Sequence, residues 1–328
     1  MCQKTYYNQL MEQWFVLNEP NLAMSSSVKY HQLFYKYIRP FFRNIPISQI
    51  SEELLETYKR FLVSKCSGEG SENLSSETVR CISMLVNQCL VLAQKEHMLS
   101  PGMRLNIRLK KNRNVVQVFS SSEQEKLEDY LRSHPNISTV CVLLCLYTGL
   151  RIGELCSLKW SDIDLEEDVL YVNRTVQRLK SQKQPETTAL FITPPKTDCS
   201  FRAIPIPDFI KDVLYSYRPK KGERGYILSD IPQKPMDPRT MQYRYKKYLR
   251  EAGVPYRKFH TLRHTFATRC LMSGMDAKTL SELMGHADVK TTLNCYCHTT
   301  LEYKREQLNL LSPFSQISKN TSCPAPHK

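Results

Sequence analysis

Apolar residues recur at spacings of three and four along most of the first 111 residues, a pattern that predicts amphipathic helices. The stretches that carry it are residues 7–17, 27–42, 51–65 and 75–99. Ser51 and Ser76 are each followed by acidic residues, so we expect both to be helix N-caps. This part of the chain therefore predicts a small domain of four or five helices.

The pattern changes after residue 120. A serine-capped helix is expected over 120–133, and a strongly apolar helix over 137–148. β-Branched and aromatic residues then dominate three segments, at 168–179, 187–195 and 200–207. We expect these segments to form three strands of a small antiparallel sheet, with Pro195 to Ser200 as a turn.

Helical spacing returns in the last third of the chain. It covers residues 207–217, 237–253, 261–274, 276–285 and 288–296. Asp276 and Asp288 suit N-cap positions, and Gly274 and Gly285 suit the position just after a helix end. The predicted fold class is therefore α+β, mainly α with a small antiparallel β-sheet.

We expect the domain boundaries to follow these changes in pattern. Residues 1–111 form the helical domain, residues 112–119 the end of a basic linker, and residues 120–312 the second domain. Residues 313–328 are polar and contain proline, so a flexible tail is expected there.

The net charge of the chain indicates which class of molecule it binds. The sequence has 46 Lys and Arg against 32 Asp and Glu, a net charge of +14, which attracts polyanions such as nucleic acid. One basic run contains no acid and comprises Arg104, Arg108, Lys110, Lys111 and Arg113. We favour a strap across a DNA phosphate backbone for this run, and a solvated linker is the alternative.

Neither a membrane protein nor a metal protein is predicted. The longest apolar run, residues 140–147, is far shorter than the roughly 20 residues that cross a bilayer, so we expect a cytoplasmic protein. The twelve cysteines form no CxxC pair and are expected to be free thiols. Residues 295–298 read CYCH but lack a second pair at zinc-finger spacing, so no metal or other cofactor is expected.

Tyr296 ends the stretch GHADVKTTLNCY and is either a packing residue or a nucleophile. A phenol with a pKa near 10 is only about 0.1% ionised at neutral pH. To attack a phosphodiester it needs a proton acceptor, a proton donor for the leaving oxygen, and cations that neutralise the phosphate. Those groups must come from elsewhere in the chain.

Two candidates lie at the start of a predicted helix. His260 and Arg263 are three residues apart and share one helix face, so one can handle a proton while the other binds a phosphate. His264 lies about 100° further round and suits a packing role. The alternative is a helix with a surface arginine and a histidine satisfied by its neighbours.

Arg151, Lys196 and His286 are further candidates. Arg151 is expected in the first turn of a helix, where a cation opposes the dipole; the placement is explained if it faces an anion and Glu154 holds it. Lys196 is expected at a hairpin tip, from where an ammonium could protonate a leaving oxygen, and a solvated lysine is the alternative. His286 lies beside a helix-ending glycine, ten residues before Tyr296.

The order of these motifs resembles that of the tyrosine recombinases, the phage and transposon integrase family. The matching segments are TGLRIGEL, LKWSDID, KTDCSFRAIPIP, HTLRHTFAT and LMGHADVKTTLNCY. The resemblance runs from about residue 120 to residue 300, and the helical region before it fits the family's core-binding domain, which grips DNA. Five separated elements agree in type, spacing and order, so the motifs are specific in combination.

The resemblance implies metal-independent cleavage and rejoining of DNA through a 3′-phosphotyrosyl intermediate. The implied catalytic residues are Arg151, Lys196, His260, Arg263, His286 and Tyr296. The tyrosine would attack, the two arginines would bind the scissile phosphate, and the lysine would protonate the leaving 5′ oxygen. The first histidine would accept the tyrosine proton and the second would hydrogen-bond the phosphate, with Glu154 steadying an arginine.

The family acts as a homotetramer on synapsed DNA sites, so the implied partners are double-stranded DNA and further copies of this chain. Residues 300–314 would either dock on a neighbouring protomer or pack on their own subunit. The helical region starts almost at Met1, so we expect no additional N-terminal domain for arm sites. The alternative functions are a type IB topoisomerase and a non-catalytic DNA-binding regulator.

Overall fold

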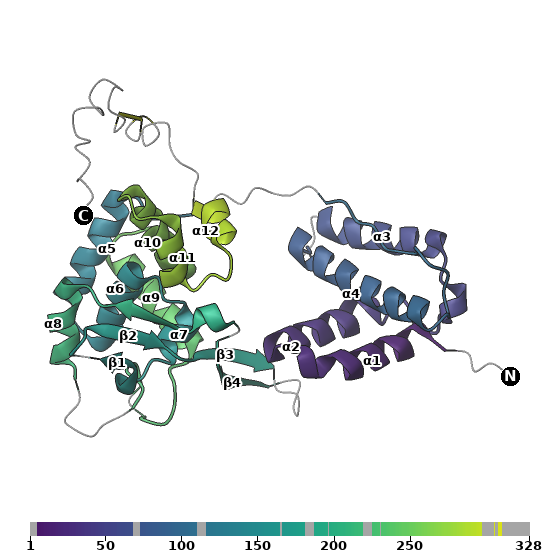
Figure 1. Ribbon diagram of the computed structural model, residues 1–328, viewed down its shortest axis with the longest axis horizontal. Coiled ribbons are helices and arrows are strands. Elements are labelled where there is room, and N and C mark those ends of the chain that lie inside the picture. The colour runs from purple at the N-terminus through teal and green to yellow at the C-terminus, as the bar shows by residue number, and fades with distance from the viewer. Residues whose placement is uncertain are drawn as a thin grey trace, which may run out of the picture. The chain divides into compact units, whose positions relative to one another are not determined.

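A computed structural model of the chain describes residues 5–67, 73–109, 116–164, 166–180, 187–195, 197–218, 225–229 and 231–296, together with 305, 308 and 309. The side chains of residues 67, 198 and 294–296 are not part of this description. The described residues form two compact units (Figure 1). The first is drawn from residues 1–114 and 179–188, and the second from residues 115–178 and 189–328.

The first unit is helical, as predicted. Its elements are α1 (Tyr7–Asn18), α2 (Met24–Leu33), α3 (Glu52–Ser67) and α4 (Ser76–Lys95), with short 3₁₀ turns at Glu19–Asn21 and Ile47–Gln49. The second predicted helix differs in its course, because it begins at Met24 and continues into a π-helical turn, Phe34–Ile38. In the core of this unit, the fully buried ring of Phe42 contacts the fully buried rings of Tyr7 and Tyr58.

One of the two N-cap predictions for this unit is right. The Ser51 hydroxyl accepts a hydrogen bond from the Leu54 amide at 3.2 Å, as an N-cap does. In α4 the predicted cap, Ser76, is already helical, and Ser75 caps the helix instead by accepting from the Thr78 amide at 3.1 Å. Ser75 has the extended backbone, φ −67° and ψ 148°, that brings its hydroxyl to the free amides of the first turn.

The basic run after α4 is packed on the first unit in its described part. Residues 103–109 are extended, and their side chains alternate between the core and solvent. Leu105 is buried, and the Asn87 side chain donates to its carbonyl oxygen at 3.0 Å and accepts from its amide at 2.8 Å. Arg104 and Arg108 are exposed, so this segment presents two arginines from a fixed backbone rather than from a loose linker.

The second unit contains every helix predicted for its part of the chain. They are α5 (Ser121–Ser133), α6 (Ile137–Thr148), α7 (Ile152–Cys156), α8 (Asp208–Ser216), α9 (Pro238–Glu251), α10 (His260–Met272), α11 (Ala277–Met284) and α12 (Val289–Tyr296). α6 contacts α5, α8, α9 and α10 and carries the buried Cys141 and Cys145, whereas α10, α11 and α12 pack against one another (Figure 1). Ser120, Asp276 and Asp288 accept hydrogen bonds from first-turn amides, which confirms these N-caps.

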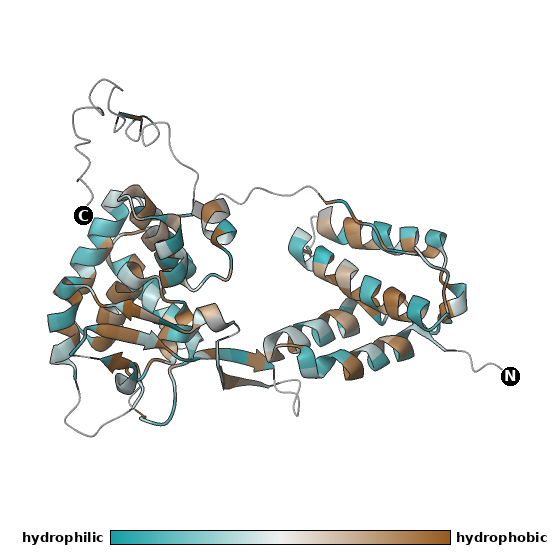
Figure 2. Cartoon of the chain, viewed as in Figure 1, coloured by the Kyte–Doolittle hydropathy of each residue, from teal (hydrophilic) through white to brown (hydrophobic). Residues whose placement is uncertain are grey.

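The strands depart from the prediction in number and pairing. β1 (Ile163–Asp164), β2 (Val169–Val172) and β5 (Arg202–Pro205) form an antiparallel sheet in the order β1-β2-β5, with β2 largely apolar (Figure 2). β3 (Thr175–Lys180) and β4 (Thr188–Thr193) pair in a second sheet. The prediction of one strand over 168–179 is therefore wrong, because the chain leaves the first sheet between β2 and β3.

A buried acid explains this break. Asp162 is 4% exposed, and its carboxylate accepts hydrogen bonds from the Asn173 side chain, at 3.1 Å, and from the Arg174 guanidinium. Ser157 donates to the Arg174 carbonyl oxygen at 3.0 Å. That carbonyl is thereby taken out of the β-ladder, so the chain turns from one sheet into the other at Asn173 and Arg174.

The connection from β4 to β5 is not a hairpin tip, because the two strands belong to different sheets. The expected turn is present as a 3₁₀ turn, Asp198–Ser200. Lys196 lies outside the described residues, as do Lys110, Lys111 and Arg113 and the expected tail at 313–328. Within the described ranges, no helix has both the length and the apolar character needed to cross a membrane.

Candidate functional site

Arg151 stands immediately before α7 and not in its first turn, because the helix begins at Ile152. Its backbone is extended, with φ −75° and ψ 148°. The predicted contact with Glu154 is present: the Arg151 amide donates to Oε2 at 2.9 Å and Nη1 donates to Oε1 at 2.7 Å. The Arg151 side chain is 36% exposed, so it is held on one side and open on the other.

Arg202 on β5 is a second partner of Glu154, a contact that the motifs do not predict. Its Nη2 donates to Oε2 at 2.8 Å and its Nη1 to Oε1 at 3.2 Å, a two-pronged pair in which both side chains are 5% exposed. The sequence does hold a signal for it. Arg202 and the buried Ile204 are two apart on a strand and share a face, and a cation on a core face requires a buried acid.

The two arginines fix the charge of Glu154. Burial by itself raises the pKa of a carboxyl group, but hydrogen bonds and charge from Arg202, and charge from Arg151, outweigh burial and lower the pKa of Glu154 to about 2. The carboxylate is therefore ionised at neutral pH. Two guanidinium groups against one carboxylate leave the cluster positively charged.

Arg263 on α10 is buried, which excludes the alternative of a surface arginine. The residue is 2% exposed. Its Nη1 donates to the Gly149 carbonyl oxygen at 2.6 Å and its Nη2 donates to the Met284 carbonyl oxygen. Nη2 also lies 3.0 Å from Nε2 of His286. Two of its contacts are therefore with backbone oxygens, which carry no formal charge.

Three consecutive carbonyl groups at the end of α11 each accept a hydrogen bond from a different arginine. The acceptors Leu283, Met284 and Gly285 receive Arg202, Arg263 and Arg151, respectively. The last carbonyls of a helix lack helical partners and carry the negative end of its dipole, so they suit guanidinium groups. Gly285 ends the helix with φ +61°, which confirms its predicted position, and a Cβ there would lie 3.0 Å from Arg202 Nη1.

His286 connects this cluster to α12. A guanidinium only donates, so Nε2 of His286 accepts from Arg263. Nδ1 then carries the proton and donates to Oγ1 of the buried Thr292 at 2.9 Å. Desolvation, followed by the charges of Arg263 and Arg151, lowers the pKa of His286 to about 4, so the ring is neutral at pH 7.

His260 begins α10, one turn before Arg263, and is exposed. Its ring meets the His264 ring edge-on, with the centroids 4.5 Å apart, which agrees with a packing role for His264. Partial desolvation, His264 and the charge of Arg263 lower the pKa of His260 to about 4. A neutral imidazole at the edge of an arginine cluster can accept a proton.

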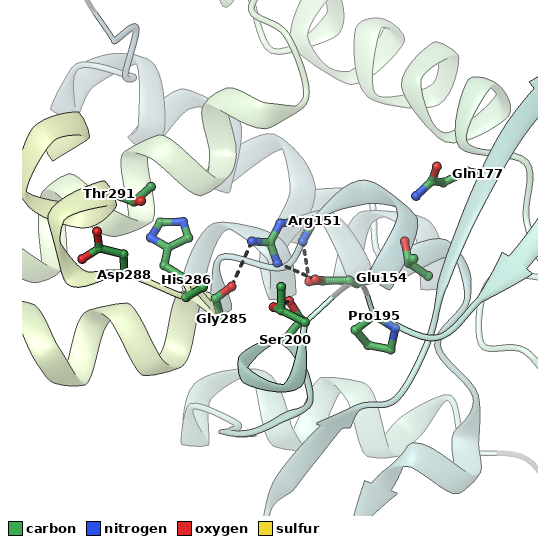
Figure 3. Close-up of a pocket in the computed structure, with 12 residues that line it drawn as sticks. Arg151, Glu154, Gln177, Pro195, Ser200, Gly285, His286, Asp288 and Thr291 are labelled. Atoms are coloured by element: carbon green, nitrogen blue, oxygen red, sulfur yellow. Dashed lines mark hydrogen bonds and ion pairs between the residues drawn. The ribbon is translucent and has the colours of Figure 1, made fainter. Parts of the chain in front are cut away.

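A cleft of about 490 Å³ opens beside these arginines in the second unit (Figure 3). Arg151, Glu154 and His286 line it, together with Thr175 and Gln177 of β3. Figure 3 places Gln177 and His286 on opposite sides of Arg151. The open side of the Arg151 guanidinium therefore faces a space in which a phosphate and its neighbouring nucleotides can lie.

Lys196 and Tyr296 are related to this cleft through their chain neighbours. Pro195 and Thr197, on either side of Lys196, both line it. Tyr296 is the last residue of α12, four residues after Thr292, and its side chain lies outside the description. The sequence-predicted residues that the structure brings together are Arg151, His260, Arg263 and His286. In the described ranges, no group of three or more His, Cys, Asp or Glu side chains is arranged to hold a metal ion.

Comparison with known proteins identifies a family match in each of the two units. Residues 117–302 match the phage integrase family, and residues 6–62 match the SAM-like N-terminal domain of phage integrases. A tyrosine recombinase XerC-like protein of Caldanaerobacter subterraneus subsp. tengcongensis is 34% identical over 216 residues, which cover 60% of this chain and 54% of the relative. The transposase from transposon Tn916 of Enterococcus faecalis is 28% identical over 217 residues, 61% and 52% of the two chains. The chain spans about half the length of these two relatives.

Solved structures share the fold. The Tn1549 transposon integrase in complex with transposon right end DNA matches with a TM-score of 0.75 and 20% identity, over 94% of this chain and 100% of that chain. A lambda integrase tetramer bound to a Holliday junction matches with a TM-score of 0.63 and 17% identity, over 92% and 80% of the two chains. These likenesses confirm the predicted fold class, a mainly helical chain with small sheets and an N-terminal helical domain.

Proposed function

Because this chain belongs to the phage integrase family, we propose that it is a site-specific DNA recombinase, an integrase that cuts and rejoins double-stranded DNA through a 3′-phosphotyrosyl intermediate. The observation that carries the proposal is the set of three arginines anchored at the end of α11, of which Arg151 lines the cleft. Cations fixed in advance where a phosphate reacts stabilise the charge of its transition state and can do so in place of a metal ion.

The reaction follows from the assigned roles. Arg151 and Arg263 bind the non-bridging oxygens of the scissile phosphate, and the Tyr296 oxygen attacks phosphorus. The bond from phosphorus to the 5′ oxygen breaks as the phosphotyrosyl bond forms. Lys196 donates a proton to the leaving 5′ oxygen, and His260 accepts the proton of the phenol. A 5′-hydroxyl from another duplex then attacks the phosphotyrosyl phosphorus. This attack releases Tyr296 and joins strands from the two duplexes.

The two histidines support this scheme. A pKa near 4 keeps His260 neutral at pH 7, the form that accepts a proton. His286 contacts Arg263 directly, so a phosphate held by that arginine comes within reach of the His286 ring. Positive charge from Arg263 depresses both histidine pKa values, and a bound phosphate offsets that charge. DNA binding therefore raises the pKa of both histidine rings once the scissile phosphate is in place.

We assign the parts of the chain accordingly. Residues 1–111 grip DNA, with the basic run that starts at Arg104 crossing a phosphate backbone; residues 112–119 link them to the catalytic domain at 120–312.

Strand exchange needs two duplexes and four active sites, so the working form is a homotetramer, the state in which lambda integrase is seen on a Holliday junction. The energy of the cleaved bond is kept in the phosphotyrosine, so no small-molecule cofactor is required. The reaction takes place in the cytoplasm.

Covalent capture tests the proposal. The protein is incubated with EDTA and randomly nicked genomic DNA, on which cleavage beside a nick releases the short 5′-hydroxyl end and traps the adduct. We expect an adduct that withstands denaturant, with captured sequences that cluster at a few sites. Adducts at scattered sequences, with relaxation of supercoiled plasmid and no recombinant product, would indicate a type IB topoisomerase. DNA binding without any adduct would indicate a non-catalytic regulator.

A further inference from the structure

Arg202 distributes its hydrogen bonds over three separate parts of the second unit. Nη1 and Nη2 bind the two carboxylate oxygens of Glu154, Nε donates to the Leu283 carbonyl oxygen at 2.7 Å, and Nη1 donates to the Ser200 carbonyl oxygen at 3.1 Å. The side chain is 5% exposed and is not part of the described lining of the cleft. Any influence of Arg202 on a bound substrate must therefore pass through its neighbours.

Glu154 is the first route. Each of its carboxylate oxygens accepts one bond from Arg151 and one from Arg202: Oε1 at 2.7 and 3.2 Å, and Oε2 at 2.9 and 2.8 Å. Arg202 approaches from the buried side and fixes the plane of the carboxylate. That plane in turn fixes the Arg151 guanidinium on the side of the cleft.

The end of α11 is the second route. Arg151 Nη2 donates to the Gly285 carbonyl oxygen at 3.2 Å, and Arg202 holds the Leu283 carbonyl oxygen two residues earlier. The two contacts lie on one rigid helix end, where the absence of a Cβ at Gly285 lets the Arg202 side chain approach closely. Arg202 therefore contacts one anchor of Arg151, Glu154, directly and binds the helix end that carries the other.

We propose that Arg202 is a positioning residue, which clamps Glu154 to the end of α11 and thereby fixes the direction in which Arg151 presents its guanidinium to the cleft. Its effect on DNA cleavage rests on the proposed function, whereas its effect on Arg151 does not. An ammonium at this position would keep the charge but not the two-pronged contact and the two carbonyl contacts. Charge and geometry can accordingly be separated by substitution.

Two variants of the full chain separate them, with a third as a control. Arg202→Gln removes the charge and the two-pronged pair, and Arg202→Lys removes only the geometry. Lys211 lies on α8, in the same unit but outside the described cleft lining, and Lys211→Gln breaks its ion pair with Asp168. Thermal unfolding and DNA affinity are measured first, so that rates refer to folded, DNA-bound protein.

The first readout is the Arg151 guanidinium resonance in DNA-free protein, assigned by comparison with Arg151→Lys. We expect it to shift and broaden in both Arg202 variants and to stay unchanged in Lys211→Gln. The second readout is single-turnover adduct formation on saturating nicked DNA. We expect about a 100-fold fall in both Arg202 variants, the effect of a small misplacement of a reacting group, with DNA affinity changed less than about threefold.

The pH profile supplies a third readout. Loss of the Arg202 charge raises the pKa of the buried Glu154 carboxyl from its depressed value. The rate of Arg202→Gln, relative to wild type, should therefore fall further as the pH is lowered from neutrality, whereas that of Arg202→Lys should not.

An unchanged Arg151 resonance in Arg202→Gln, with an unchanged rate per folded molecule, would overturn the proposal and leave Arg202 a purely structural residue. If the wild-type protein forms no adduct at all, the proposed function fails. In that case the Arg151 resonance alone still decides whether Arg202 positions its neighbour.

Discussion

At the scale of single residues, Thr292 sets the state of a neighbouring ring. It is fully buried and accepts the only proton that a neutral His286 has to donate, since Nε2 faces Arg263. Thr292→Val keeps the shape but leaves this N–H without its partner. We expect the free energy of unfolding to fall by about 1 kcal/mol in urea denaturation, and the ¹⁵N shifts of His286 to report a changed tautomer.

Thr291→Val is the matched control for this prediction. Thr291 is exposed and precedes Thr292 in α12, so its replacement should change stability by less than about 0.5 kcal/mol and leave the His286 shifts in place. Equal effects of the two substitutions would show that the hydrogen bond between Thr292 and His286 contributes nothing specific.

The depressed histidine pKa values make stability depend on pH. His260 and His286 titrate near 4 in the folded chain, against a usual value of 6.5. The unfolded chain therefore binds protons first, and stability is lost as the pH falls from about 6.5 to about 4. The stabilisation that the ionised Glu154 carboxylate contributes is lost at lower pH, between its usual pKa of 4.5 and its folded-state pKa of about 2. We expect His286→Gln to flatten a thermal stability curve in the upper window only; an unchanged slope there would contradict the assigned pKa.

At the scale of elements, glycines in the left-handed conformation end α6 and α11 and turn carbonyl groups toward arginines. Gly149 has φ +66°, its carbonyl oxygen accepts from Arg263, and a Cβ there would lie 2.6 Å from Phe266 Cδ1. Gly149→Ala therefore adds a steric cost of about 1–3 kcal/mol to a backbone cost of about 1 kcal/mol. Chemical denaturation should show that the free energy of unfolding of the variant falls by the sum of these two costs.

Gly253→Ala isolates the backbone part of that cost. Gly253 also has φ +66°, but among the described residues nothing beyond its neighbours in the chain lies within 4 Å of an added Cβ. We expect the free energy of unfolding of Gly253→Ala to fall by only about 1 kcal/mol. If the two alanine variants were equally stable, the close packing assigned to the end of α6 would be wrong.

The helices could be predicted from sequence because their signals are local. Apolar spacing locates them, and Ser120, Asp276 and Gly285 mark ends within one turn of the residues they satisfy. The strands could not be predicted equally well. Whether 168–179 forms one strand depends on Asp162, which binds Asn173 and Arg174 from outside the segment and ends the ladder there.

The same distinction applies to the site. Residue type and motif order predict Arg151 and Arg263, and the three-residue spacing predicts the contact between Arg151 and Glu154. The convergence of arginines on α11 is not predictable from spacing, since Arg151 meets Gly285 across 134 residues of chain. The alternation on β5 indicates a buried acid as a partner for Arg202, but its contact with the end of α11 depends on how β5 packs against that helix.

Over the full chain, a net charge of +14 predicts that the proposed binding to DNA depends strongly on salt. Arg104 and Arg108 are exposed on a backbone pinned by Asn87. If each neutralises one phosphate, replacing both with glutamine should reduce the slope of log affinity against log salt by about 2. The loss should be nearly equal on all DNA sequences, as measured by titration at several salt concentrations. A loss confined to one sequence would mean that these arginines read bases.

We infer that a tyrosine at the end of α12 becomes a nucleophile because arginines held at the end of α11 neutralise a DNA phosphate. The most direct test is to digest the trapped adduct with nuclease and protease and to locate the attached nucleotide by mass spectrometry. We expect a 3′-linked nucleotide on Tyr296, and no adduct from Tyr296→Phe despite unchanged DNA binding. A nucleotide attached to any other residue, or an adduct that persists in Tyr296→Phe, would contradict it.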